Sequence, residues 1–106
     1  MKVGARVAKI AEAFFNNSDK NVLDNVSNVR YWKGTKSREL IYYSSPILLI
    51  ENGILSISLC GWKKITTNKR LRSILELRLS NEIINKYIKL AWEAPNERII
   101  IPEYKD

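Results

Sequence analysis

The dipeptide Asn52-Gly53 constrains the fold of this chain more than any other feature of its sequence. It lies between two apolar runs, Ile47–Ile50 and Ile54–Leu59. Asn-Gly tolerates the positive φ angles that both central residues of a type I′ turn require, so the arrangement is typical of a β-hairpin. In the second run leucine and isoleucine alternate with serine, which predicts a strand with one buried and one lighter face.

Further strands are predicted on both sides of this hairpin. Val29–Lys33, Arg38–Tyr43 and Arg98–Ile101 are rich in residues that favour strands. Pro46 has no N–H group to donate to a neighbouring strand. We therefore expect residues 44–46 to interrupt the sheet before the hairpin begins.

A helix is predicted before the first strand. Residues 3–14 carry apolar side chains at a period of 3.6 residues, and the polar run Asn16-Asn17-Ser18-Asp19 ends the pattern. Residues 20–28 are ambiguous. There, Val22 and Leu23 would fit a short helical turn that begins at Ser18 or Asp19.

Two more helices are predicted in the C-terminal half. Thr66 or Thr67 is expected to cap a helix from about Asn68 to Arg78. Ser80 is expected to cap the next helix, which Pro95 stops.

The order of these elements predicts an α+β fold. We expect an antiparallel sheet of three to five strands, with the N-terminal helix and both later helices packed on one face. A length of 106 residues predicts a single domain over residues 1–106. The longest apolar run has five residues, against the ~20 that a membrane span needs, and Lys2, Arg6 and Lys9 interrupt any secretory signal.

The composition argues against most kinds of catalytic site. The chain has no histidine and one cysteine, which excludes a disulfide framework, a structural zinc site of the usual kind and a histidine general base. No histidine is present to activate Cys60, and the glutamates form no recognisable metal motif. We therefore expect no enzyme activity, no cofactor and no metal. A lone thiol suits a reducing cytoplasm.

The charge points to an anionic partner. The chain carries 18 lysines and arginines against 11 acidic residues, a net charge of +7, and residues 63–78 hold six cations and one glutamate. That stretch combines a strand exit, a helix start, two hydroxyls and an aromatic ring. Helix N-termini accept anions, threonines donate to phosphate, and a tryptophan stacks on unpaired bases. The predicted nucleic-acid-binding residues are Trp62, Lys63, Lys64, Thr66, Thr67, Lys69, Arg70 and Arg72.

Structural readings of the same residues remain open. The threonines would then be helix caps, Trp62 a core residue and the cations an ordinary solvated face. Arg30, Lys33 and Lys36 are candidates to extend the basic surface. A second aromatic group, Tyr31, Trp32, Tyr42 and Tyr43, fits either a base-stacking platform on the sheet or plain cross-strand packing.

The middle of the chain resembles a small uncharacterised family of phage and archaeal-virus proteins. The resemblance rests on Tyr42–Ile47, Glu51–Gly53, Gly61–Lys63 and Thr66–Leu71, and covers residues 40–76. Here Ser45 stands where the family usually has threonine, and Asn68 separates the threonine pair from the following lysine. The resemblance implies a shared fold and a viral or mobile-element setting. It transfers no catalytic residue.

Three functional hypotheses follow. The first is a small, basic, non-enzymatic viral protein that binds DNA or RNA in the host cytoplasm. The alternative is a host-takeover or inhibitor protein whose basic surface binds an acidic host protein. The third is pairing of two copies as a homodimer through an exposed sheet edge at residues 99–101. A membrane partner is not expected.

Overall fold

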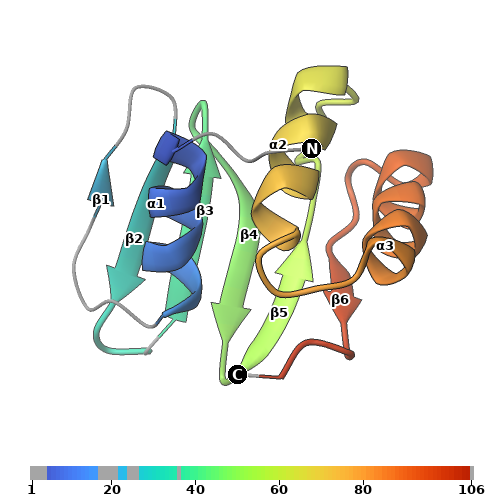
Figure 1. Cartoon of the computed structure of the whole chain (residues 1–106). Helices are drawn as coiled ribbons and strands as arrows, with labels where there is room; N and C mark the ends of the chain where they lie inside the picture. The colour runs from blue at the N-terminus through green and yellow to red at the C-terminus, as the bar shows by residue number, and fades with distance from the viewer. Residues whose placement is uncertain (1–4, 17–21, 24–26, 36, 106) are drawn as a thin grey trace.

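The computed structural model describes residues 5–16, 22–23, 27–35 and 37–105, and has the expected α+β fold. The order of its elements is α1 (Ala5–Phe15), β1 (Val22–Leu23), β2 (Ser27–Trp32), β3 (Ser37–Tyr42), β4 (Ser45–Glu51), β5 (Ile54–Ile57), α2 (Ile65–Leu75), α3 (Asn81–Glu93) and β6 (Ile99–Ile101). Figure 1 shows their arrangement.

One antiparallel sheet contains all the strands, in the spatial order β1-β2-β3-β4-β5-β6. Strands β2 to β6 are the five that the sequence allowed for, and the two-residue β1 adds to the edge beside β2. The helical turn expected around Val22 and Leu23 is wrong, because both residues pair with β2 in β1. The remainder of that expectation, including Ser18 and Asp19, lies outside the described residues.

The Asn52-Gly53 turn joins β4 to β5 as predicted. Asn52 has φ 55° and Gly53 has φ 77°, and Glu51 pairs with Ile54 across the turn. The expectation that residues 44–46 interrupt the sheet is wrong. Here Tyr43 and Ser44 both take positive φ angles, which forms a second tight turn, and β4 resumes at Ser45.

A β-bulge explains how Pro46 fits into a paired strand. Leu40 pairs with Leu48 and Ile41 pairs with Pro46, so Ile47 is an extra residue in β4. Bulges tolerate proline because the regular hydrogen-bond ladder is already broken there. The bulge also leaves both Ile47 and Leu48 fully buried.

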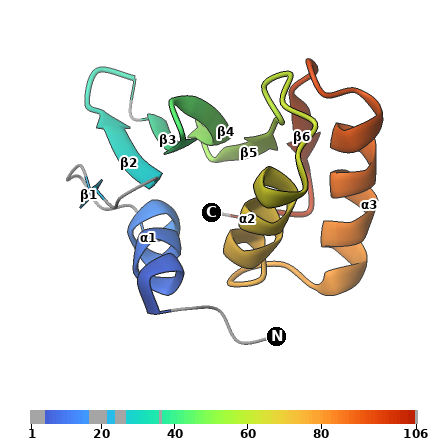
Figure 2. The same cartoon turned by 90° about the horizontal axis from the view of Figure 1, so that it is seen from above.

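The three helices cover one face of the sheet, as Figure 2 shows. Helix α1 lies over β2 and β3, and α2 lies between α1 and α3. The core between the layers includes Phe14 from α1, Leu71 and Ile74 from α2, and Ile84 from α3. Ser80 caps α3 as expected, because its hydroxyl accepts a hydrogen bond from the Ile83 N–H at 3.5 Å.

The other face of β5 is more closed than the alternating sequence predicts. Ser56 and Ser58 are both buried. Arg98, just before β6, donates from Nη1 to the Ser56 hydroxyl at 3.1 Å and from Nη2 to the Pro46 carbonyl. Its burial lowers the pKa of the guanidinium. A long side chain from a distant part of the sequence therefore covers the serines.

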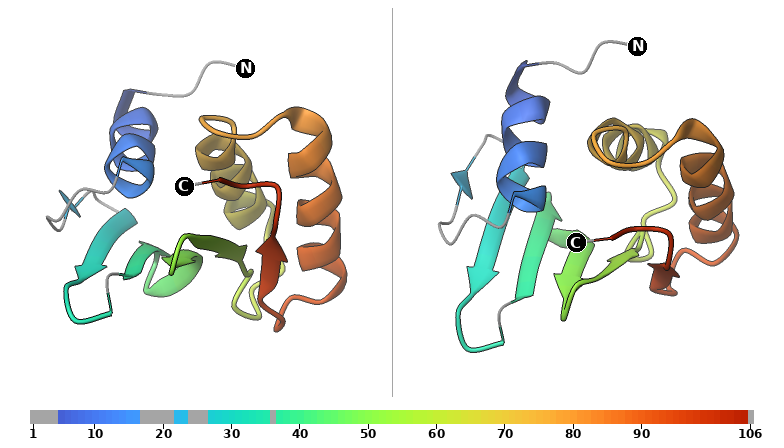
Figure 3. Two further views of the ribbon diagram at one scale, coloured as in Figure 1. Left: turned by 90° about the horizontal axis from the view of Figure 1, so that it is seen from below. Right: turned by 60° about the horizontal axis from the view of Figure 1, so that its bottom comes forward.

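The segment after β6 turns back from the sheet edge towards α1 (Figure 3). Tyr104 is buried there, with its ring 5.6 Å from that of Phe15. Tyr87 in α3 donates its hydroxyl to the Glu103 carboxylate, and Lys86 Nζ lies 3.8 Å from the same carboxyl group. The hydrogen bond lowers the pKa of Glu103 and raises that of Tyr87.

Tyr87→Phe is therefore expected to raise the pKa of Glu103, measured by NMR titration of its carboxyl carbon. A carboxyl whose pKa falls on folding stabilises the fold above its unfolded pKa, about 4.3, and loses that contribution as the pH falls through its folded pKa. The variant should be less stable than the parent at neutral pH, with the difference shrinking in acid. Lys86→Gln is the control and should raise the pKa less, since the lysine is a smaller cause of the lowering. An unchanged Glu103 titration in Tyr87→Phe would contradict the assignment.

Candidate functional site

Helix α2 starts earlier than the sequence suggests and has no side-chain cap. It begins at Ile65, and its N-cap Lys64 has extended backbone angles (φ −119°, ψ 142°). Thr66 and Thr67 lie in the first turn, so the expectation that one of them is the cap is wrong. Backbone hydrogen bonds from Trp62 N to Leu59 O (2.8 Å) and from Lys64 N to Trp62 O (2.9 Å) tighten the preceding loop. That tightening brings the chain into the helix early.

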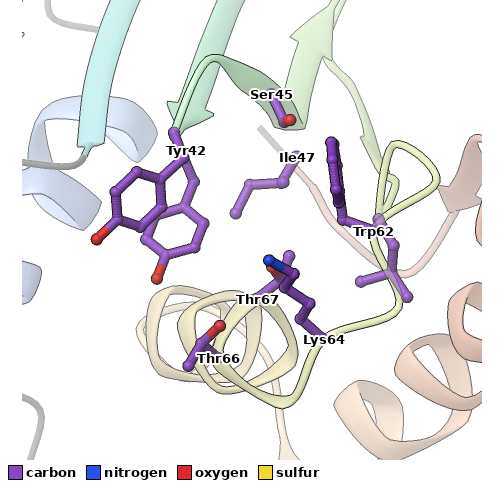
Figure 4. Close-up of a pocket in the computed structure, with 9 residues that line it drawn as sticks. Tyr42, Ser45, Ile47, Trp62, Lys64, Thr66 and Thr67 are labelled. Carbon is purple, nitrogen blue, oxygen red and sulfur yellow. The ribbon is translucent and has the colours of Figure 1, made fainter.

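A pocket of about 360 Å³ opens beside this helix start, between α2 and the turn that joins β3 to β4. Figure 4 shows Tyr42 on one side, Trp62 on the other and Ile47 between them. No acidic side chain lines it. The lining residues are Tyr42, Tyr43, Ser45, Ile47, Leu59, Trp62, Lys64, Thr66 and Thr67.

Two exposed aromatic rings lie on the rim of the pocket, one from each side. Tyr43 is 66% exposed and Trp62 is 56% exposed. The Tyr43 ring packs edge-on against the buried Tyr42, with centroids 4.7 Å apart. Trp62 is thus a surface residue, contrary to the alternative that placed it in the core. Both rings are available to a flat ligand.

Cations surround the same helix start. Lys64 Nζ lies 5.2 Å from the centre of the Trp62 ring, and the Arg70 guanidinium lies 5.2 Å from that of Tyr42. Lys69 and Arg70, together with Thr66, line a shallower depression next to the pocket. Each contact with an aromatic face is a cation–π interaction, which holds the cation without neutralising it.

Two of the predicted residues point elsewhere. Lys63 Nζ lies 5.2 Å from the centre of the Trp92 ring in α3. Arg72 donates to the Asn85 Oδ1 atom of α3 at 2.5 Å. The structure therefore brings Trp62, Lys64, Thr66 and Thr67 together at the pocket, with Lys69 and Arg70 beside them, while Lys63 and Arg72 face α3.

The proposed extensions of the basic surface lie away from the pocket. Arg30 pairs with Glu39, and the alternation from the buried Val29 puts it on the sheet face opposite the helices. Lys33 belongs to the turn between β2 and β3, at the other end of β3 from Tyr43. Lys36 lies outside the described residues.

The single aromatic platform expected on the sheet is also wrong. Trp32 lies on the face opposite the helices, where its Nε1 donates to Glu39 at 2.5 Å. Tyr42 lies on the helix side and packs against Tyr43 beside α2. Sequence reasoning did not anticipate Ser45, Ile47 or Leu59 in the pocket, and it considered the two tyrosines only as part of that platform.

Other kinds of site have little support among the described residues. They contain no cluster of three or more thiol or carboxylate groups that would hold a metal ion. The half-buried Cys60 donates its Sγ–H to the Pro46 carbonyl at 3.4 Å. None of the helices in the described ranges is long and apolar enough to cross a bilayer.

No family model, curated protein or solved structure matches this chain. The resemblance to phage and archaeal-virus proteins therefore stays a prediction. The argument about function rests on the geometry beside α2.

Proposed function

We propose that this chain is a small, non-enzymatic viral or mobile-element protein that binds nucleic acid through the start of α2. One observation carries the proposal: uncompensated cations surround an uncapped helix N-terminus. Within the described part of the chain, Lys64, Lys69 and Arg70 form no ion pair with a carboxylate. No side chain there caps the N–H groups of the first turn.

The chemistry of these groups suits phosphate. Free N–H groups at a helix start and the helix dipole favour an anion, and lysine and arginine neutralise further charge along a backbone. Thr66, exposed in the first turn, adds a hydroxyl donor. Such contacts position a nucleic acid without reading its sequence. The prediction is thus salt-dependent binding with little base preference.

The test is fluorescence anisotropy with single-stranded DNA, duplex DNA and RNA at 50 and 200 mM salt. Two double variants are compared, Lys64→Glu/Lys69→Glu at the site and Lys33→Glu/Lys89→Glu away from it. All four lysines are exposed. Each Lys→Glu change removes two units of charge, so both variants carry +3 instead of +7.

The site variant is expected to weaken binding by roughly tenfold or more. It should also flatten the salt dependence by about 0.7 logarithmic units per lost contact on single strands. The distant variant should keep most of the affinity. Equal losses in both variants would reduce the effect to net charge, and no binding at 50 mM salt would refute the proposal. Binding of an acidic protein after nuclease treatment would then favour the alternative partner.

A further inference from the structure

We propose that the pocket beside α2 binds one unstacked nucleotide, with its base against Tyr43 and Trp62 and its phosphate at Lys64 and the first turn of α2. The proposal rests on the proposed function and deepens it, because it predicts preference for unpaired over paired nucleic acid. A volume of about 360 Å³ suits one small ligand, since small-molecule sites typically run from ~300 to ~1,000 Å³. The stacked, paired bases of a duplex present no free base to enter it.

A buried hydroxyl in the pocket wall needs a partner. Thr67 is only 5% exposed, yet its hydroxyl makes no hydrogen bond within the described part of the chain. Buried polar groups are normally satisfied, because an unpaired one costs free energy. Thr67 lies in the first turn of α2, where the uncapped N–H groups are. A phosphate oxygen there would accept from the hydroxyl and from the backbone together.

The cation of the pocket is placed to meet the same anion. Lys64 is the N-cap of α2, and Figure 4 shows its side chain reaching into the space between Tyr42 and Trp62. Its ammonium lies 5.2 Å from the centre of the Trp62 ring. A phosphate bound at the helix start would therefore be close to both the positive charge and the aromatic rim.

The aromatic rim supplies the surface that a base requires. Tyr43 and Trp62 expose more than half of their surface at the two sides of one pocket, although rings of this size usually pack inside a protein. Base–aromatic stacking contributes to single-strand binding for every base, because each base has a π face. The ligand class is thus a nucleotide of any base, either free or as part of a single strand.

The experiment separates stacking from charge. Fluorescently labelled single-stranded and duplex DNA with equal numbers of phosphates are titrated at 50 mM salt against Tyr43→Ala and Trp62→Ala. The matched controls Tyr43→Phe and Trp62→Phe keep a ring. Each alanine variant should weaken single-strand binding by roughly tenfold. Duplex binding and the salt dependence should stay unchanged because no charge is altered. Thr67→Val, which removes only the hydroxyl, should also weaken single-strand binding.

The outcomes are distinguishable from those of the proposed function. Competition by AMP, but not by adenosine or inorganic phosphate, at concentrations near the single-strand Kd would assign the pocket to free nucleotides. A polymer preference without that competition would assign it to single strands. Equal affinity for single strand and duplex, with both alanine variants neutral, would overturn the inference and leave phosphate binding intact. Absence of all polymer binding would overturn both.

Discussion

Replacement of Phe14 by alanine is expected to lower the free energy of unfolding by about 3–5 kcal/mol. Phe14 is 0% exposed, and its ring packs edge-on against Phe15 at 5.1 Å between centroids. Truncation removes buried apolar surface and leaves a cavity that the close-packed layer fills only in part. A domain of this size has about 5–15 kcal/mol of total stability, so much of it would be lost. Urea unfolding followed by circular dichroism measures the change.

Two other α1 variants act as controls. Glu12→Ala changes an exposed residue of the same helix and should stay within about 0.5 kcal/mol of the parent. Phe14→Leu refills most of the cavity and should fall between the two. A loss below 1 kcal/mol in Phe14→Ala, or two separate unfolding transitions, would show that α1 is not part of one cooperative core with the sheet.

Much of the fold could be predicted because the relevant forces are local. Asn52-Gly53 satisfies positive φ angles with its own two residues. Ser80 caps α3 by reaching three residues ahead. The apolar stripe of α1 needs no knowledge of its partner. Pro46 misled the prediction because its missing N–H indicates a break in the ladder, and only the register with β3 shows that a bulge absorbs it.

The candidate site was predicted only in part, for a physical reason. Local composition identifies the cations and hydroxyls of residues 62–72. It does not show that Tyr43 and Ile47, about 20 residues earlier, form the opposite wall of the same pocket. Nor does helical periodicity say which neighbour each exposed cation meets, and Arg72 turns towards Asn85 of α3. Such pairings depend on how α2, α3 and the β3–β4 turn pack together.

The second large effect is expected at Gly61, where alanine should lower the free energy of unfolding by about 1–3 kcal/mol. Gly61 has φ 83°, which strains any residue with a Cβ atom. An added Cβ would also lie 2.7 Å from Asn96 Oδ1, closer than any normal contact. Gly61 N donates to the Pro95 carbonyl at 2.8 Å, so a shift of this loop would displace Trp62, the next residue. Single-strand affinity should therefore fall together with stability.

A second substitution separates the two causes. Asn96→Ala removes the clashing amide of an exposed side chain but leaves the backbone of residue 61 unchanged. Gly61→Ala/Asn96→Ala should recover the part of the loss that comes from the clash and keep the part that comes from φ. Both single variants and the double variant are unfolded in urea as a double-mutant cycle. Full recovery would mean that the left-handed backbone costs nothing. A neutral Gly61→Ala would show that the loop before α2 is not held as described, and the placement of Trp62 beside the pocket would fall with it.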